Sequence, residues 1–279
     1  MQNYILYRTE NSIHSINECR YSLLKLLALY NLQAPKNLGI VIHTKHPESF
    51  DAFTSFFSEI EFVAEAPQEK FKIELIQDFF ATRQGNLLYM DNDTYLLQAP
   101  DELFENISNS ANIIFFQKKQ GPKKLKDFIS ASHIMLDGRE INFLDETELY
   151  TAEVLGCNND AIAMIHNAVD LYNQVKDGVS LMMAEAFAFT YASKEYKRQT
   201  SEKQIVSYRK FPEFKNLLQV FFKKNEEESI PNLVKMVHHL DAVAIEKDKA
   251  TYEQLPFFKK LLHSVTGKAW SLRRYQNKF

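Results

Sequence analysis

The first half of the chain alternates short apolar runs with longer segments in which apolar residues recur at helical spacing. The short runs predict strands over 4–8, 39–44, 60–64 and 87–90. Apolar positions three or four residues apart predict the helices between them, over 14–30, 47–58 and 69–83. Strands that alternate with helices in this way are typical of βαβ units around a mainly parallel sheet. The pattern therefore predicts an α/β fold with helices on both faces of the sheet.

The second half adds a few more strands and then becomes largely helical. A short helix is predicted over 100–108, and strands over 112–117, 132–136, 151–156 and 204–208. The stretch 118–126 carries five lysines and Gly121-Pro122, which predicts an exposed loop, and Asp145-Glu146-Thr147-Glu148 predicts an acidic link. Amphipathic helices are expected over 161–175, 181–192, 213–223, 230–245 and 252–265. We place a boundary near residue 210, between a sheet-containing domain (1–210) and a helical extension packed on it (211–279).

Composition narrows the class of protein. The formal net charge of −3 provides no overall positive field, so nucleic acid is not the expected partner. Cys19 and Cys157 lie far apart without metal-ligand spacing, which argues against a disulfide framework or a structural zinc site. The start of the chain lacks the pattern of a signal peptide, and no apolar run approaches the roughly 20 residues that span a bilayer. We expect a cytoplasmic protein without a transmembrane segment, and leave peripheral membrane contact open.

The acidic triplet Asp91-Asn92-Asp93 is the strongest candidate for chemistry. Only seven glycines occur, and none are spaced as in a dinucleotide-binding or Walker loop, so side chains or a metal must meet any phosphate. The triplet follows the apolar run 87–90, and ligands of open parallel sheets bind beyond the carboxyl ends of strands. Two carboxylates suit Mg²⁺ or Mn²⁺, which would stabilise the charge on a departing nucleoside diphosphate. A solvated turn is the alternative explanation for the triplet.

The segment around this triplet resembles type-A-fold (GT-A) glycosyltransferases. In that family an apolar strand ends in YxDxDT and is followed by an apolar pair and P…LF, as in 89–104 here. The run 150–156 is similar to the family's NSGVxG strand, and 185–189 resembles its EQxAF helix. In element order the resemblance spans residues 4–208. It implies a Rossmann-like nucleotide-diphospho-sugar transferase fold for residues 1–210, with the C-terminal helical extension added.

The resemblance also implies roles for particular residues. Asp91 would face the nucleotide ribose or a metal, Asp93 would be the principal metal ligand, and Lys72 would reach the diphosphate or the sugar. Glu185 would contact the acceptor or act as general base, and Glu153 stands where the family usually has glycine, in the acceptor pocket. His263 and residues 267–270 are loosely similar to a segment that closes over the diphosphate in some members of the family. The predicted sets are Glu185 and Glu153 as catalytic residues, Asp91, Asn92, Lys72 and Lys268 as donor-binding residues, and Asp91, Asp93 and His263 as metal ligands.

The function implied is transfer of a sugar from a nucleotide-diphosphate donor to a carbohydrate, lipid-linked or protein acceptor, assisted by Mn²⁺ or Mg²⁺. The sequence leaves several points open: whether the sugar's anomeric configuration is retained or inverted, which sugar and base the donor carries, and the oligomeric state. One alternative is a non-catalytic protein of the same fold that binds a sugar nucleotide or a partner. A haloacid-dehalogenase-like phosphohydrolase, with the first Asp as nucleophile, is disfavoured because Thr94 directly follows Asp93, one position before that family expects it.

Overall fold

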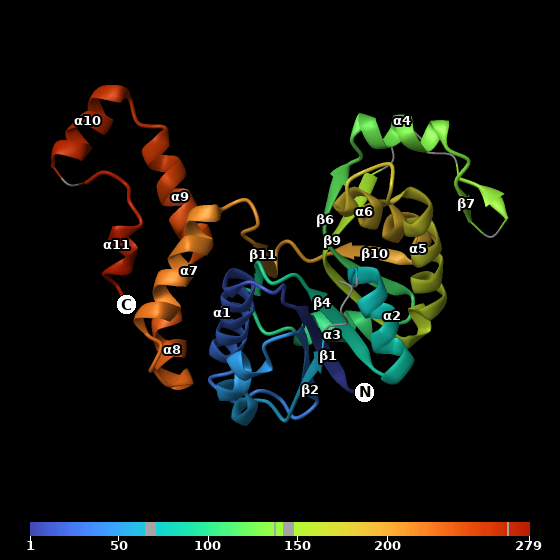
Figure 1. Ribbon diagram of the computed structural model, residues 1–279, viewed down its shortest axis with the longest axis horizontal. Coiled ribbons are helices and arrows are strands. Elements are labelled where there is room, and N and C mark those ends of the chain that lie inside the picture. Colours follow the sequence, from blue (N-terminus) through green and yellow to red (C-terminus); the bar gives the residue numbers. More distant parts are fainter. Residues whose placement is uncertain (65–70, 137, 142–147, 267) are drawn as a thin grey trace.

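A seven-stranded sheet forms the centre of the molecule in the computed structural model, which describes residues 1–64, 71–136, 138–141, 148–266 and 268–279. The strand order is β10-β6-β9-β4-β1-β2-β3 (Figure 1). The strands are β1 (Asn3–Arg8), β2 (Leu38–Thr44), β3 (Glu59–Ala64), β4 (Asn86–Met90), β6 (Asn112–Gln120), β9 (Glu148–Asn158) and β10 (Lys197–Thr200). All neighbours pair in parallel except β9, which runs antiparallel to both β4 and β6. The prediction of a mainly parallel sheet is confirmed.

Helices cover both faces of the sheet, because successive side chains of a strand point to opposite faces. Ile5 and Tyr7 of β1 belong to one buried core, while Tyr4 and Leu6 belong to the other. Against the first core pack α1 (Ile13–Leu29), the 3-10 helix η1 (Pro47–Phe56) and α3 (Asp101–Ile107). Against the second pack α2 (Lys72–Thr82), α4 (Lys123–Ala131), α5 (Ile162–Val175) and α6 (Leu181–Ala192). The inner strands β1, β2 and β4 are therefore buried on both faces, as their apolar sequences require.

The C-terminal helices continue the first core. Apolar side chains of α7 (Pro212–Lys224) and α8 (Ile230–Val237) are buried in the same cluster as those of α1. The Tyr21 hydroxyl donates to the Leu240 carbonyl oxygen at 2.6 Å, which ties α1 to the end of this helical pair. Beyond it, α9 (Ala242–Glu253), α10 (Phe257–Val265) and α11 (Arg273–Gln276) form an arm at one end of the molecule (Figure 1). The boundary near residue 210 stays a prediction.

Several local predictions are wrong, each for a local reason. The lysine-rich stretch is not a loop, because β6 continues to Gln120 and α4 begins at Lys123. The helix predicted over 230–245 is two helices, since Asp241 caps a new one by accepting hydrogen bonds from the Val243 and Ala244 amides. The helix predicted over 252–265 shrinks to α10, which begins after Pro256.

Short strands account for the remaining differences. The strand predicted over 132–136 is reduced to β7 (Met135–Leu136), which pairs with β8 (Arg139–Glu140). Two short strands, β5 (Thr94–Leu96) and β11 (Ile205–Ser207), pair antiparallel to each other. The strand β5 was not predicted. The acidic link lies outside the described residues except for Glu148. Among the described helices, none has the length and apolarity needed to span a bilayer.

Candidate active site

The acidic triplet is held at the carboxyl end of β4 by the elements on either side. All five residues of β4 are buried, and the Asp91 amide donates to the Glu153 carbonyl oxygen of β9 at 2.9 Å. The chain then enters β5, and the Tyr208 amide beyond β11 donates to the Asp93 carbonyl oxygen at 2.9 Å. The side chains of Asp91 and Asp93 are only 12% and 10% exposed. The triplet is thus a fixed, nearly buried turn rather than a solvated one.

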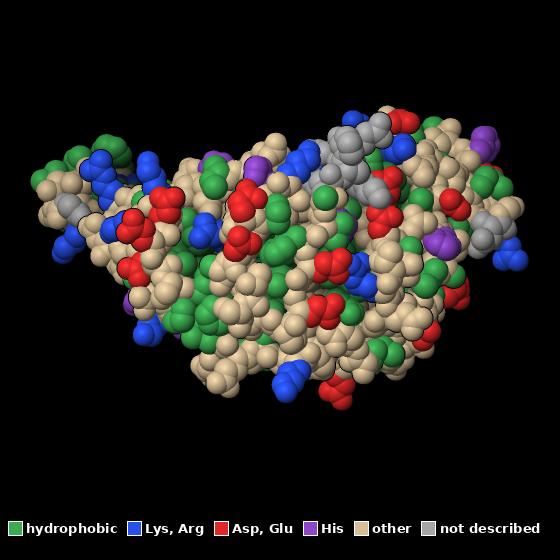
Figure 2. Space-filling view, turned by 60° about the horizontal axis from the view of Figure 1, so that its bottom comes forward, with side chains coloured by type: hydrophobic (Ala, Val, Ile, Leu, Met, Phe, Trp, Pro, Cys, Tyr) green, Lys and Arg blue, Asp and Glu red, His purple; other side chains and the backbone are tan. Residues whose placement is uncertain are grey.

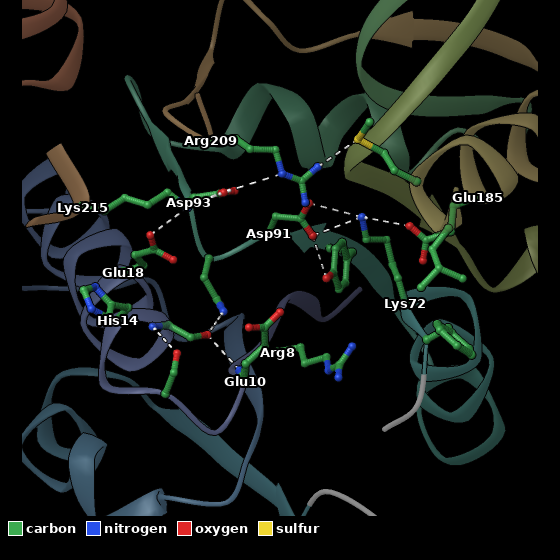
Figure 3. A pocket seen from close by; sticks show the side chains of 17 residues that line it. Arg8, Glu10, His14, Glu18, Lys72, Asp91, Asp93, Glu185, Arg209 and Lys215 are labelled. Carbon is green, nitrogen blue, oxygen red and sulfur yellow. Dashed lines mark hydrogen bonds and ion pairs between the residues drawn. The ribbon is translucent and has the colours of Figure 1, made fainter. Parts of the chain in front are cut away.

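Lys72 neutralises Asp91 from the first turn of α2. Its ammonium lies 3.1 Å from Asp91 Oδ1 and 3.6 Å from Glu185 Oε2, and it donates to the Ala152 carbonyl oxygen at 2.7 Å. Tyr89 donates its hydroxyl to Asp91 Oδ1 at 2.9 Å. Burial by itself lowers the pKa of Lys72, but Asp91 and Glu185 outweigh it and hold the pKa above the ordinary value. Lys72 is therefore a protonated, buried partner of two carboxylates (Figure 3).

Lys215 of α7 pairs with the second aspartate. Its ammonium lies 3.0 Å from both Asp93 Oδ2 and Glu18 Oε1. Burial lowers the pKa of Lys215, but the nearby carboxylates of Asp93 and Glu18 raise it by more, so the pKa lies above its ordinary value. Burial is also the main reason that the pKa of Glu18 is raised, with Lys215 opposing it. The helical extension therefore supplies a charged group to the carboxyl end of the sheet.

Arg209 stands among three carboxylates without a tight contact to any of them. Its guanidinium nitrogens lie 3.6 Å from Asp91, 3.8 Å from Asp93 and 3.7 Å from Glu153. Within the described part of the chain, its one hydrogen bond goes to Met182 Sδ, a weak acceptor. Burial lowers the pKa of Arg209, but the three carboxylates raise it further, so the group stays charged. Most of its five N–H donors are available for an anion.

Except for Glu153, these charged groups line one cleft of about 590 Å³ (Figure 3). Four cationic side chains face it, from Arg8, Lys72, Arg209 and Lys215. Five acidic side chains face it as well, from Glu10, Glu18, Asp91, Asp93 and Glu185. Leu181 and Met182, at the start of α6, add a partly exposed apolar wall. The cleft thus pairs an anion-binding cluster with an apolar side and has a small excess of acidic groups.

Six of the eight predicted site residues come together here. Besides Asp91, Asp93, Lys72 and Glu185, Asn92 lines the cleft and donates to Ser15 Oγ at 2.7 Å. Glu153 lies beside Arg209, and its Oε2 accepts a hydrogen bond from the Thr151 hydroxyl at 2.9 Å.

The structure does not bring His263 and Lys268 to this cleft. His263 lies on α10, where its ring stacks on Tyr252 with centroids 6.2 Å apart. Lys268 is exposed, and its amide donates to the His263 carbonyl oxygen. The physical reason is that the chain from α9 to α11 runs into the terminal arm, away from the end of β4 (Figure 1).

Arg209 and Lys215 are the site residues that sequence reasoning missed. Arg209 directly follows the strand predicted over 204–208, so a position at the end of a strand was the available signal. Lys215 reads as an ordinary lysine of an amphipathic helix. Only the packing of α7 on α1 brings it to Asp93.

The carboxylates can be tested as a metal site. Among the described residues, no group of three or more His, Cys, Asp or Glu side chains is arranged to hold a metal ion. The oxygens of Asp91 face Lys72, Tyr89 and Arg209, whereas Asp93 Oδ1 is buried and has no hydrogen-bond partner. Mg²⁺ and Mn²⁺ commonly take one or two protein carboxylates and complete their shell with phosphate oxygens and water. The residues present fit such a substrate-completed site centred on Asp93.

Comparisons with known proteins place the fold. No protein-family model and no curated protein sequence matches the chain. The galactosyltransferase LgtC, solved with donor and acceptor sugar analogs, is 11% identical over 71% of this chain and 73% of its own, with a TM-score of 0.51. The glycosyltransferase GlyE of Streptococcus pneumoniae TIGR4 is 11% identical over 72% of this chain, with a TM-score of 0.47. Mouse xyloside xylosyltransferase 1 is 14% identical over 71% of this chain and 84% of its own, also with a TM-score of 0.47. This chain covers 46% of the GlyE chain. The match to LgtC and the mainly parallel central sheet with helices on both faces show that the chain has the GT-A glycosyltransferase fold.

Proposed function

We propose that the chain is a glycosyltransferase that binds a nucleotide-diphosphate sugar in the cleft at the carboxyl end of β4. One observation carries this proposal: Asp91 and Asp93 meet Lys72, Arg209 and Lys215 in one cleft of a GT-A fold. Such an arrangement has charged donors for a diphosphate and carboxylates for hydroxyl groups of the donor. The cleft volume of about 590 Å³ lies in the usual range for small-molecule sites.

Arg209 is the residue best placed to take the diphosphate. Its carboxylate neighbours lie at 3.6 to 3.8 Å, beyond ordinary hydrogen-bond length, so little is lost when the guanidinium turns to a phosphate. A guanidinium also matches phosphate oxygens with two parallel hydrogen bonds. Lys215 would hold Asp93 in place and add positive charge behind it.

In the proposed complex, a divalent cation helps to neutralise the charge of the bound diphosphate. The acidic side chains that line the cleft outnumber the cationic ones, so an incoming diphosphate calls for additional positive charge. Asp93 would hold Mg²⁺ or Mn²⁺ through its Oδ1, which has no hydrogen-bond partner among the described residues, and Asp91 would face the ribose or the same ion. When bound, the ion supplies Lewis acidity that favours departure of the nucleoside diphosphate.

Glu185 is the carboxylate we assign to the acceptor side. It faces the cleft from α6 and stays close to Lys72, near the apolar wall formed by Leu181 and Met182. There it would orient the acceptor hydroxyl or accept its proton in an inverting reaction. Glu153 would position Arg209, with which it is paired, rather than contact the acceptor.

A non-catalytic protein that binds a sugar nucleotide is the second candidate. The observation in its favour is that both predicted catalytic carboxylates face cations: Glu185 lies 3.6 Å from Lys72 and Glu153 lies 3.7 Å from Arg209. A carboxylate held by a neighbouring cation is a weaker proton acceptor.

Titration calorimetry with UDP and GDP, with and without Mn²⁺, followed by donor-hydrolysis and transfer assays, separates these candidates. Metal-dependent binding with turnover supports the enzyme, and binding without turnover supports the second candidate. Asp93→Asn should abolish the metal dependence, whereas the exposed Asp51→Asn serves as a control and should not. If chelation by EDTA leaves binding and turnover unchanged, the metal is excluded and Arg209 with Lys215 would neutralise the diphosphate alone.

A further inference from the structure

The nine-residue helix α10 presents its apolar face to solvent. Its sequence, Phe-Phe-Lys-Lys-Leu-Leu-His-Ser-Val, separates into two faces at 100° per residue. The apolar residues fall within an arc of about 140°, and the polar residues occupy the opposite arc. The apolar set is Phe257, Phe258, Leu261, Leu262 and Val265, with exposed fractions of 73%, 80%, 53%, 60% and 81%.

The orientation of this helix is the reverse of that in a water-soluble surface helix. Its polar side is the one turned toward the protein, where Lys260 donates to the Glu253 carbonyl oxygen and His263 stacks on Tyr252. No residue of α10 is buried. Figure 2 shows hydrophobic side chains gathered with Lys and Arg at the end of the molecule where Figure 1 places this helix. A contiguous exposed apolar patch of this kind marks an interaction surface.

The charge around the patch indicates what covers it. Residues 254–279 contain no Asp or Glu and six basic residues, namely Lys259, Lys260, Lys268, Arg273, Arg274 and Lys278. The protein as a whole carries a net charge of −3, so this positive segment stands out from the rest of the chain. A short helix with aromatic and leucine residues on one face, flanked by basic side chains, has the chemistry of a segment that lies in the interface of an anionic bilayer.

We propose that α10 and the basic residues of the segment 254–279 bind the surface of an anionic lipid membrane. Phe257, Phe258 and Val265 insert among the acyl chains, while Lys259, Arg273 and Arg274 meet the lipid phosphates. Because the apolar face already points outward, docking requires no rearrangement of the rest of the protein. The glycosyl-transfer cleft takes no part in this contact, so the membrane proposal stands or falls independently of the proposed function.

Co-sedimentation of the full chain with lipid vesicles tests the proposal. The wild-type protein should pellet with vesicles of phosphatidylcholine and phosphatidylglycerol, and less with phosphatidylcholine alone. Binding should weaken when NaCl is raised from about 0.1 M to about 1 M, which shortens the Debye length from about 10 Å to about 3 Å. Phe258→Glu should lower the partition coefficient by about tenfold or more, since one phenyl group no longer enters the bilayer.

Matched variants keep the test specific. Met135→Glu, a change of the same kind at an exposed methionine on β7, should bind vesicles like the wild type, and Phe258→Trp should retain binding. Circular dichroism checks that each variant is folded. If Phe258→Glu is unfolded, Arg273→Gln with Arg274→Gln provides the second test and should reduce binding to anionic vesicles only. Wild-type protein that stays in the supernatant at low salt, or a Phe258→Glu variant that binds as well as the wild type, overturns the proposal. So does a wild-type dimer that Phe258→Glu dissociates without vesicles, because a second copy would then cover this face.

Discussion

Replacing Lys72 with Met measures how far the acidic end of β4 depends on one buried cation. Lys72 lies 3.1 Å from Asp91 and 3.6 Å from Glu185, and all three side chains are at most 14% exposed. Methionine keeps most of the apolar stem but removes the ammonium, so two nearly buried carboxylates lose a partner. Breaking a buried ion pair in this way costs about 3–5 kcal/mol, because an uncompensated charge remains.

The expected loss lies at the lower end of that range. Asp91 keeps the hydrogen bond from Tyr89 and the guanidinium of Arg209 at 3.6 Å, whereas Glu185 loses its one ion pair within the described residues. We therefore expect Lys72→Met to lower the free energy of unfolding by about 3 kcal/mol. This is a large share of the roughly 5–15 kcal/mol that stabilises a typical domain.

Urea unfolding followed by circular dichroism at neutral pH measures this loss. Lys235→Met, at an exposed helical lysine, is the control and should change the free energy of unfolding by no more than about 0.5 kcal/mol. The double variant Lys72→Met/Glu185→Gln should recover part of the loss, because one of the two unpaired charges is gone. A Lys72→Met variant as stable as the Lys235→Met control would show that water already solvates these carboxylates, and the account of the site would be wrong.

Three further predictions concern the cleft. Arg209→Gln should weaken binding of the nucleoside diphosphate by about 30-fold, the equivalent of about 2 kcal/mol for a charged bidentate contact, while the exposed neighbour Lys210→Gln should bind like the wild type in calorimetry. Glu185→Gln should reduce transfer by about 100-fold or more and change donor affinity little, and wild-type turnover in a transfer assay would remove Glu185 from the mechanism. Because the pKa of Glu18 is raised by folding, the wild type loses stability from this group as pH rises from about 4.5 through the folded-state pKa. The free energy of unfolding of Glu18→Gln relative to the wild type should thus increase with pH over that window, and a pH-independent difference in urea titrations would contradict the burial of this carboxylate.

Much of the sheet was predictable because its inner strands β1, β2 and β4 are buried on both faces and read as mainly apolar runs. These three strands and the edge strand β3 lie within one residue of the predicted ranges at both ends. The errors fall where local propensity competes with pairing. Lys118, Lys119 and Gln120 look like loop residues. They extend β6 because they pair with residues 148–150 of β9, which lie about 30 residues further along the chain. The boundary between α8 and α9 depends on a capping hydrogen bond of Asp241, which periodicity does not register.

The amino-acid sequence by itself determined the α/β class, the position of Asp91 and Asp93 after a buried strand, and the absence of a glycine-rich phosphate loop. These features depend on neighbouring residues and on the spacing of apolar residues along the chain. Tertiary structure alone decided that Lys215 and Arg209, more than 110 residues further along the chain, meet the two aspartates, and that His263 does not. It also decided that α10 turns its apolar face outward, since a helical period identifies an amphipathic helix but not what its apolar side contacts. The reason is the same in each case: charges and apolar faces find their partners through packing between distant segments, which spacing along the chain does not encode.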